Sequence, residues 1–135
     1  MDYLENARRI FKEDYFATEA AGIVIDKVEP GYAKCTMPLG KIHKNAAGNV
    51  MGGAVFTLAD FAFGVAANTE ERVSTVSLTS EIRFIGFSKG SVLTAEARRI
   101  REGKSVAFYD VEVCDDLGTV VAKVAMTGAR KVFQA

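Results

Sequence analysis

Residues 52–68 form an apolar segment long enough for about five helical turns, and one carboxylate, that of Asp60, interrupts it. Asp60 is the only charged residue between Lys44 and Glu70. A segment this apolar is typical of a helix buried in a protein core. Because burying an unpaired ionised carboxylate costs several kcal/mol, Asp60 is expected to be paired, to coordinate something or to use a shifted pKa for chemistry.

The small and polar residues of this segment fall on one side of the helix at 3.6 residues per turn. They are Gly53, Thr57, Asp60, Gly64 and Asn68. The rest of the helix surface is apolar. The pattern predicts a helix buried nearly all round, with one narrow face turned to a ligand, a water-filled cleft or a partner helix. It favours a functional Asp60 over a solvated or capping one.

Patterns of period two follow the helix and predict a sheet. Long strands are expected over residues 74–87, 91–101, 105–114 and 119–132. Glycine-containing hairpin turns at 101–104 and 115–118 connect the last three. From residue 107 to residue 113 every second residue is apolar, which is typical of a sheet with one covered face.

Shorter elements precede the helix. Residues 3–17 carry apolar side chains at helical spacing among charges, which predicts an amphipathic surface helix. Residues 23–25 and 33–37 look like strands joined by a turn at 29–31. One core helix and about six strands indicate an α+β fold in which an antiparallel sheet wraps a central helix, with a single domain over residues 1–135.

The charge balance excludes some classes of partner. The 17 basic and 17 acidic side chains cancel, so the sequence has no bulk electrostatic footprint for nucleic acid or an anionic membrane. Asp60 also argues against a membrane span over the apolar segment. The charged N-terminal residues predict a cytoplasmic protein. Cys35 and Cys114 lack CxxC spacing, so no metal site or disulfide framework is expected.

His43 is the only histidine of the chain. A serine or cysteine triad would depend on this residue alone. Because it lies in a polar loop beside Lys44, it is predicted to be exposed to solvent. The sequence also contains no GxGxxG or HExxH motif.

Three groups of residues occur in a characteristic order: Asn45, then Met51-Gly52-Gly53, then Leu58-Ala59-Asp60. This order resembles the motif of the hotdog-fold acyl-CoA thioesterases, in the branch that includes the phenylacetate-pathway (PaaI-like) enzymes. The resemblance covers nearly the whole chain. It implies a hotdog fold and hydrolysis of a small aromatic or short- to medium-chain acyl-CoA without a cofactor, since coenzyme A is part of the substrate.

The resemblance also implies roles for individual residues. Asp60 matches the catalytic carboxylate, the Gly52 backbone N–H the donor that polarises the thioester, and Asn45 a side chain that positions thioester or water. Ser77 matches a polar strand residue near the attacking water in some members, and a strand serine that bonds locally is the equal alternative. Met51 replaces the family's His before the double glycine and so removes a polar group from the site.

Further residues are candidates for binding the substrate. Phe56 could border the acyl pocket, with core packing as the alternative. Gly53 and Gly64 permit close approach to the open face of the helix. Coenzyme A phosphates need cations to bind them. A cluster of basic residues on a strand can instead be a face exposed to solvent without a ligand. The cations expected to serve are Arg98, Arg99 and Lys104.

The spacing of Gly52 and Asp60 predicts a dimer. The two residues are about 12 Å apart along one helix, whereas both must lie within about 3–4 Å of the same acyl group. If two copies pack these helices antiparallel about a two-fold axis, two identical composite sites form. We therefore expect a homodimer, or a homotetramer of two dimers, in which Asp60 of one subunit faces Gly52 and Asn45 of the partner subunit.

Several chemical and functional alternatives stay open. Asp60 could attack the carbonyl carbon or activate a water as general base. The main alternative function is a non-catalytic acyl-CoA or small-ligand binding protein of the same fold, which the absence of the family's His at Met51 favours. A hydratase of this fold would need a histidine, for which His43 is poorly placed, and a purely structural oligomer is a further alternative.

Overall fold

The structure is a computed structural model that describes residues 1–70 and 73–132. Its helical elements are α1 (Tyr3–Phe11), the π-helical turn η1 (Phe16–Ala20), the short 3-10 helix η2 (Lys41–His43) and α2 (Gly52–Ala67). Its strands are β1 (Val24–Glu29), β2 (Tyr32–Pro38), β3 (Val73–Phe84), β4 (Val92–Glu102), β5 (Val106–Asp115) and β6 (Val120–Val132).

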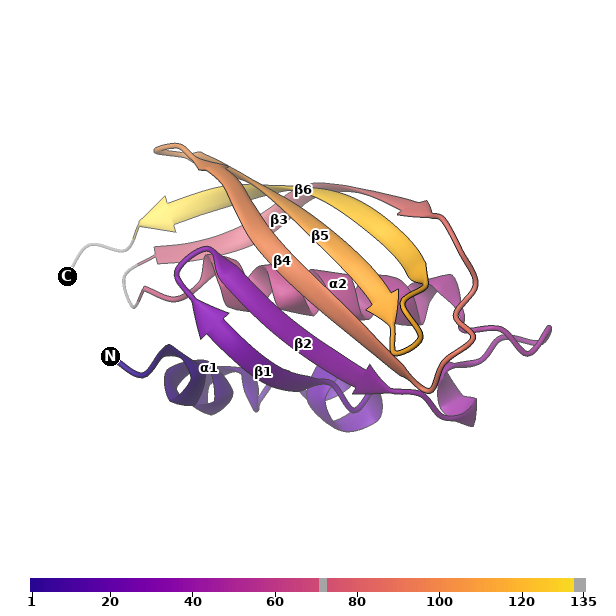
Figure 1. The fold of residues 1–135 in the computed structure, drawn as a ribbon. Coiled ribbons are helices and arrows are strands. Elements are labelled where there is room, and N and C mark those ends of the chain that lie inside the picture. The colour runs from indigo at the N-terminus through magenta and orange to yellow at the C-terminus, as the bar shows by residue number, and fades with distance from the viewer. Residues whose placement is uncertain (71–72, 133–135) are drawn as a thin grey trace.

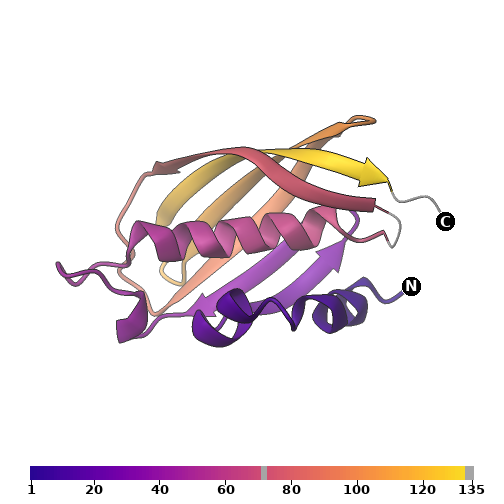
Figure 2. The ribbon, with the colours of Figure 1, turned by 180° about the vertical axis from the view of Figure 1, so that it is seen from behind.

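The strands form one antiparallel sheet in the order β1-β2-β4-β5-β6-β3. The sheet curves around α2, which lies along its inner face, and α1 lies beside the edge strand β1 (Figures 1 and 2). The predicted α+β fold, with an antiparallel sheet wrapped around a central helix, is confirmed. None of the helices among the described residues is long and apolar enough to cross a membrane.

Helix α2 forms where the apolar segment predicts it because its apolar side chains are buried against the sheet. Its buried side chains are Val55, Leu58, Ala59, Phe61, Ala62, Phe63, Val65 and Ala66. Burial of each large apolar side chain contributes about 1.5–3 kcal/mol, so contact with the sheet holds the helix in place more than helix propensity does. The predicted small and polar stripe, from Gly53 to Asn68, is the side that the sheet leaves open.

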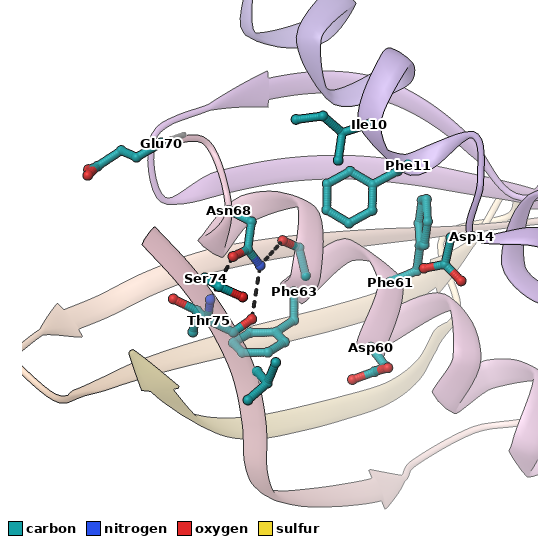
Figure 3. Close-up of a pocket in the computed structure, with 12 residues that line it drawn as sticks. Ile10, Phe11, Asp14, Asp60, Phe61, Phe63, Asn68, Glu70, Ser74 and Thr75 are labelled. Atoms are coloured by element: carbon teal, nitrogen blue, oxygen red, sulfur yellow. Dashed lines mark hydrogen bonds between the residues drawn. The ribbon is translucent and has the colours of Figure 1, made fainter. Parts of the chain in front are cut away.

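The end of α2 is joined to β3 by the side chain of Asn68. Its Nδ2 donates to the carbonyl oxygens of Gly64 (2.8 Å) and Thr75 (3.0 Å), and its Oδ1 accepts from the Thr75 N–H (2.6 Å). Figure 3 shows these bonds beside the aromatic residues of the helix. Asn68 therefore closes the open stripe at one end and fixes where β3 starts to run along the helix.

The helix predicted over residues 3–17 is shorter than expected. α1 ends at Phe11, and η1 follows as a separate turn. The Thr18 hydroxyl, in η1, donates to the carbonyl oxygens of Lys12 (3.3 Å) and Asp14 (3.0 Å) in the segment between the two elements. Local side-chain bonds of this kind compete with a continuous helix.

The strand predicted over residues 74–87 also ends early, at Phe84. The next two N–H groups, of Ile85 and Gly86, both donate to the Val121 carbonyl (2.8 and 3.2 Å), which breaks the regular ladder. The N–H groups of Lys89 and Gly90 then donate to the buried carboxylate of Asp115 (2.9 and 3.1 Å). These bonds hold the segment out of the sheet.

Strand β3 lies at one edge of the sheet, and no strand of the described residues pairs with its outer side. It carries exposed apolar side chains, among them Val76 (61% exposed), Leu78 (60%) and Phe84 (57%). A long edge strand with exposed apolar residues is a surface on which another chain can add its own strand. This edge strand runs alongside α2 (Figure 2).

Candidate active site

Asp60 lies midway along α2, on the open stripe, where it lines a cavity of about 490 Å³. Aromatic side chains form much of the wall: Phe11 and Phe61 meet edge to face with ring centroids 5.7 Å apart, and Phe63 lies two residues further along α2 (Figure 3). Asp14, from the turn after α1, lines the same cavity. The core helix and the N-terminal segment therefore enclose the carboxylate together.

Burial raises the pKa of Asp60, and the negative charge of Asp14 raises it further. Within the described residues, no hydrogen bond or ion pair engages the Asp60 carboxylate. A carboxylate with a raised pKa and free oxygens is a better base than an ordinary aspartate at neutral pH. Its raised pKa and its place on the open stripe make Asp60 a candidate catalytic residue.

The start of α2 offers amide hydrogens without partners. Met51 is the N-cap, and its side chain makes no capping hydrogen bond. Its carbonyl accepts from Ala54 (3.0 Å) and Val55 (3.2 Å), whereas no hydrogen bond in the described part of the chain uses the N–H of Gly52 or Gly53. Free amides at a helix N-terminus attract a negatively charged or polarised oxygen.

Gly52 is held close to the edge strand. A β-carbon at this position would lie 2.9 Å from the far end of the Phe84 ring, so a side chain here would displace the ring from its close packing on the backbone. A second cavity, of about 430 Å³, opens beside the helix start. Met51, Gly53 and Thr57 line it, together with Phe16 and Ile42, and its wall is largely apolar.

The two cavities share no lining residue. Asp60 opens into the first, and the residues on either side of Gly52 open into the second. One copy of the chain therefore does not bring the carboxylate and the helix-start amide to a common point. This agrees with their separation of about 12 Å along the helix axis.

Asn45 lies in the exposed loop before α2. Its Oδ1 accepts from the N–H groups of Ala47 (3.0 Å) and Asn49 (3.1 Å). Because two donors point at Oδ1, the orientation of the amide is fixed. No hydrogen bond within the described residues uses its Nδ2, which leaves a donor for a ligand.

The remaining predicted residues lie at different places. Gly64 lines the cavity of Asp60, whereas Phe56 is partly buried and packs against the core. Ser77 is exposed on β3, and the cavity is bounded there by Ser74, Thr75 and Val76 instead. The catalytic and binding roles of these residues stay predictions.

The predicted phosphate-binding cations line neither cavity. The Arg98 guanidinium pairs with Glu96 (3.0 Å) and lies over the Tyr32 ring, 4.7 Å from its centroid. Arg99 pairs with Glu102 (3.3 Å), and Lys104 is exposed in the hairpin between β4 and β5. That hairpin lies at the end of the sheet opposite the start of α2 (Figure 1).

Sequence reasoning is wrong about one residue of this region and misses another. His43, predicted to be exposed, is buried, and both of its ring nitrogens make contacts. The proximity of Asp14 to Asp60 is missed because it joins residues 46 positions apart (60 − 14). A contact this distant leaves no local pattern in one sequence.

Comparisons with known proteins agree with the fold described above. Residues 7–129 match the family described as "Domain of unknown function (DUF4442)". The chain is 33% identical over 120 residues to the acyl-coenzyme A thioesterase PaaI of Escherichia coli, covering 87% of this chain and 84% of that protein. The structure of E. coli PaaI superposes with a TM-score of 0.87 at 26% identity, over 98% of this chain and 97% of that one.

Two further relatives extend this comparison. The chain is 33% identical over 96 residues to a candidate esterase of Archaeoglobus fulgidus, and the match covers 71% of this chain and 62% of that relative, slightly under two thirds of its length. The structure of a hypothetical thioesterase of Streptococcus pneumoniae with coenzyme A has a TM-score of 0.82 at 25% identity, over 93% of this chain and 99% of that one. The predicted hotdog fold is confirmed.

Proposed function

The chain belongs to the DUF4442 family and to the PaaI-like hotdog-fold acyl-CoA thioesterases, which are thioester hydrolases, and from this premise we propose that it hydrolyses a small aromatic or short- to medium-chain acyl-CoA to the free acid and coenzyme A. The observation that carries the proposal is Asp60, a carboxylate of raised pKa on the open stripe of a buried helix, with no hydrogen-bond or ion-pair partner among the described residues. No cofactor enters the proposed reaction, because coenzyme A is part of the substrate.

The proposed site is shared between two subunits. Two observations support this: the carboxylate and the helix-start amides face separate cavities within one chain, and both the stripe of α2 and the edge of β3 are open. Antiparallel packing of two stripes about a two-fold axis would set Asp60 of one subunit opposite Gly52 and Asn45 of the partner subunit. The small residues Gly53 and Gly64 let the two helices approach closely.

In the proposed reaction, the Gly52 N–H donates a hydrogen bond to the thioester carbonyl oxygen and stabilises the negative charge that develops there. Asp60 either removes a proton from the attacking water or itself attacks the carbonyl carbon. The tetrahedral intermediate then expels the coenzyme A thiolate. In the second route, water hydrolyses the mixed anhydride and releases the carboxylic acid and the ionised Asp60.

The walls of the cavities support an uncharged acyl group of modest size. Phe61 and Phe63 present apolar rings beside the carboxylate, and about 490 Å³ lies within the usual range of small-molecule pockets. The Arg99 N–H donates to the Gly31 carbonyl, and the Gly31 N–H donates to Ala66 near the end of α2, so the cations proposed for the coenzyme A phosphates lie at the end of the sheet away from the helix start. Antiparallel packing would carry this end of one subunit toward the helix start of the partner subunit.

Release of free thiol from a panel of aromatic and aliphatic acyl-CoA substrates tests this function directly. We expect turnover of phenylacetyl-CoA or of short- to medium-chain acyl-CoA by the purified wild-type protein. Binding of these thioesters without any thiol release across the panel would instead support the non-catalytic binding protein, which the absence of the family's His at Met51 favours.

Removal of the Gly52 N–H should lower kcat by on the order of 10²–10³, the usual effect of deleting one oxyanion donor. Gly52→Pro removes this hydrogen at the first helical position, where proline is well tolerated, and the extended Met51 before it (ψ 145°) is compatible with a following proline. The measurement is kcat for thiol release, with circular dichroism to check the fold.

Gly52→Ala is the matched control, because it adds the same β-carbon against Phe84 and keeps the N–H. We expect it to retain kcat within about tenfold of the wild type, since the exposed Phe84 ring can move aside. Equal losses in the two variants would mean that crowding, rather than the hydrogen bond, causes the effect.

Asp14→Asn should move the acidic limb of the pH profile of kcat/KM to lower pH. Asp60 acts as the carboxylate, so activity rises with pH through its pKa, and removal of the Asp14 charge lowers that pKa. Burial, the larger cause, remains in the variant. The plateau rate should change by less than about threefold. Glu13→Gln is the control, because it removes a neighbouring charge that does not line the cavity. The acidic limb of its pH profile should stay at the wild-type position.

A further inference from the structure

The buried side chain of His43 has no part in the proposed chemistry, yet its ring is completely engaged. It is only 6% exposed. Nδ1 accepts a hydrogen bond from the Gly40 N–H (2.9 Å), and Nε2 lies 2.8 Å from the Ala21 carbonyl oxygen. Because a carbonyl can only accept, Nε2 carries the hydrogen and Nδ1 is the bare acceptor. The contacts therefore select one neutral tautomer.

The backbone of His43 reaches the start of α2 directly. Its carbonyl oxygen accepts from the Met51 N–H (2.8 Å), and Met51 is the residue that precedes Gly52. A bridge between Lys44 and Val50 closes the intervening loop beside this bond. His43 thus lies at the base of the loop, with its carbonyl on the helix start and its ring on the N-terminal segment.

The N-terminal segment provides a firm anchor for the ring. Ala21 follows the turn η1, where its own N–H donates to Phe16 (2.9 Å), and the Ile23 N–H donates to the buried Ala17 (2.9 Å). These bonds lead into β1, so the ring of His43 connects the helix start to the sheet.

Apart from the packing of Phe84 against Gly52, the start of α2 has few other restraints. Met51 supplies no side-chain cap, and two successive glycines are the most flexible opening that a helix can have. An oxyanion donor acts only when it already points to where the charge will develop. Something must therefore fix the direction of the Gly52 N–H before the substrate arrives.

We propose that His43 is a positioning residue for thioester hydrolysis. Its two ring hydrogen bonds hold the Met51–Gly52 peptide in the orientation that the transition state requires. This inference rests on the proposed function of Gly52. His43 also lines the cavity beside the helix start, but only 6% of the residue is exposed, so loss of the ring bonds should change substrate affinity little. It would lower the rate of the chemical step.

Three substitutions at this position separate the two ring bonds. His43→Leu removes both, and we expect kcat to fall by about 10- to 100-fold, part of the loss for deleting the donor itself, with KM within about threefold of the wild type. His43→Asn keeps an acceptor near the position of Nδ1, and His43→Gln keeps a donor near that of Nε2. Each should give an intermediate kcat.

Val28→Ala is the control for a loss of stability alone. It truncates a buried residue of β1 next to the turn whose Gly31 N–H bonds to Ala66, at the opposite end of α2. Assayed well below its melting temperature, it should keep the wild-type kcat. Amide hydrogen exchange should be faster at Gly52 and Gly53 in His43→Leu than in Val28→Ala.

The results separate this inference from the function on which it rests. A wild-type protein without thioesterase activity overturns the function, and the exchange rates then decide alone whether His43 orders the helix start. With an active wild type, the inference fails if folded His43→Leu keeps kcat within threefold, or if KM rises while kcat is unchanged. Should His43→Leu not fold, wild-type kcat in both His43→Asn and His43→Gln is the overturning result.

Discussion

Asp60→Asn is expected to lower kcat for acyl-CoA hydrolysis by on the order of 10³, while the protein remains folded. The amide has the shape of the carboxylate but can neither take a proton from water nor attack a carbonyl carbon, and loss of such a group typically costs 10²–10⁴ in rate. KM should change much less, because the apolar walls of the cavity are unaltered. Steady-state thiol release measures both constants.

The same substitution should leave thermal stability unchanged or higher at pH 7. The pKa of Asp60 is raised in the folded protein, so its ionised form is less favourable in the folded state than in the unfolded chain, and this cost is present at pH values above the folded pKa. Asn removes the charge and therefore the cost. Thermal unfolding of the two proteins at pH 7 measures this effect.

Asp26→Asn is a suitable control for Asp60→Asn, because Asp26 is exposed at the bulge of β1. It should alter neither rate nor melting temperature appreciably. If Asp60→Asn kept more than about a tenth of the wild-type kcat, the carboxylate would not be the catalytic base or nucleophile, and the proposed mechanism would have to be abandoned.

Mixed dimers that carry Asp60→Asn in one subunit and Gly52→Pro in the other should recover about half of the wild-type activity per dimer. If each site takes its carboxylate from one subunit and its amide from the other, one site of the mixed dimer contains both substitutions and the other contains neither. Each variant alone should be at least 10²-fold impaired. The recovery is therefore large against a low background.

Co-expression with two different affinity tags isolates the mixed dimers for this measurement. A site built entirely within one subunit predicts the opposite result, because every site would then contain one of the substitutions. Mixed dimers as inactive as their parents would thus disprove a shared site. Co-expression of two tagged copies of Asp60→Asn provides the control for the tags, and it should show no recovery.

The fold can be predicted from the sequence to the extent that its signals are local. The apolar segment with its polar stripe gives α2 within one residue, since the structure has Gly52–Ala67 where the pattern indicates 52–68. The turn before Tyr32 is also correct, because Gly31 adopts a positive φ of 76° that glycine accommodates readily. The strand after α2 is predicted too long because the bonds that end it come from the distant residues Val121 and Asp115.

The candidate site is predicted only in part for the same reason. Asp60 stands out because a charge in an apolar segment is visible in sequence, and the rise per residue of a helix separates it from Gly52. The burial of His43 is not visible, because the partner of its Nε2 is Ala21, 22 positions earlier in the chain (43 − 21). Polar residues around such a histidine predict exposure, whereas the folded segments on both sides of the loop enclose it.

The separation of the two cavities within one chain has a consequence for how the protein responds to its own abundance. Chemistry assembled across a subunit boundary stops when the subunits part, so specific activity should decline on dilution below the dissociation constant of the pair. Freshly diluted samples would then slow gradually at the rate of subunit separation, and concentrated stocks would regain speed by a second-order process. Expression level would set how many copies are competent as well as how many are present.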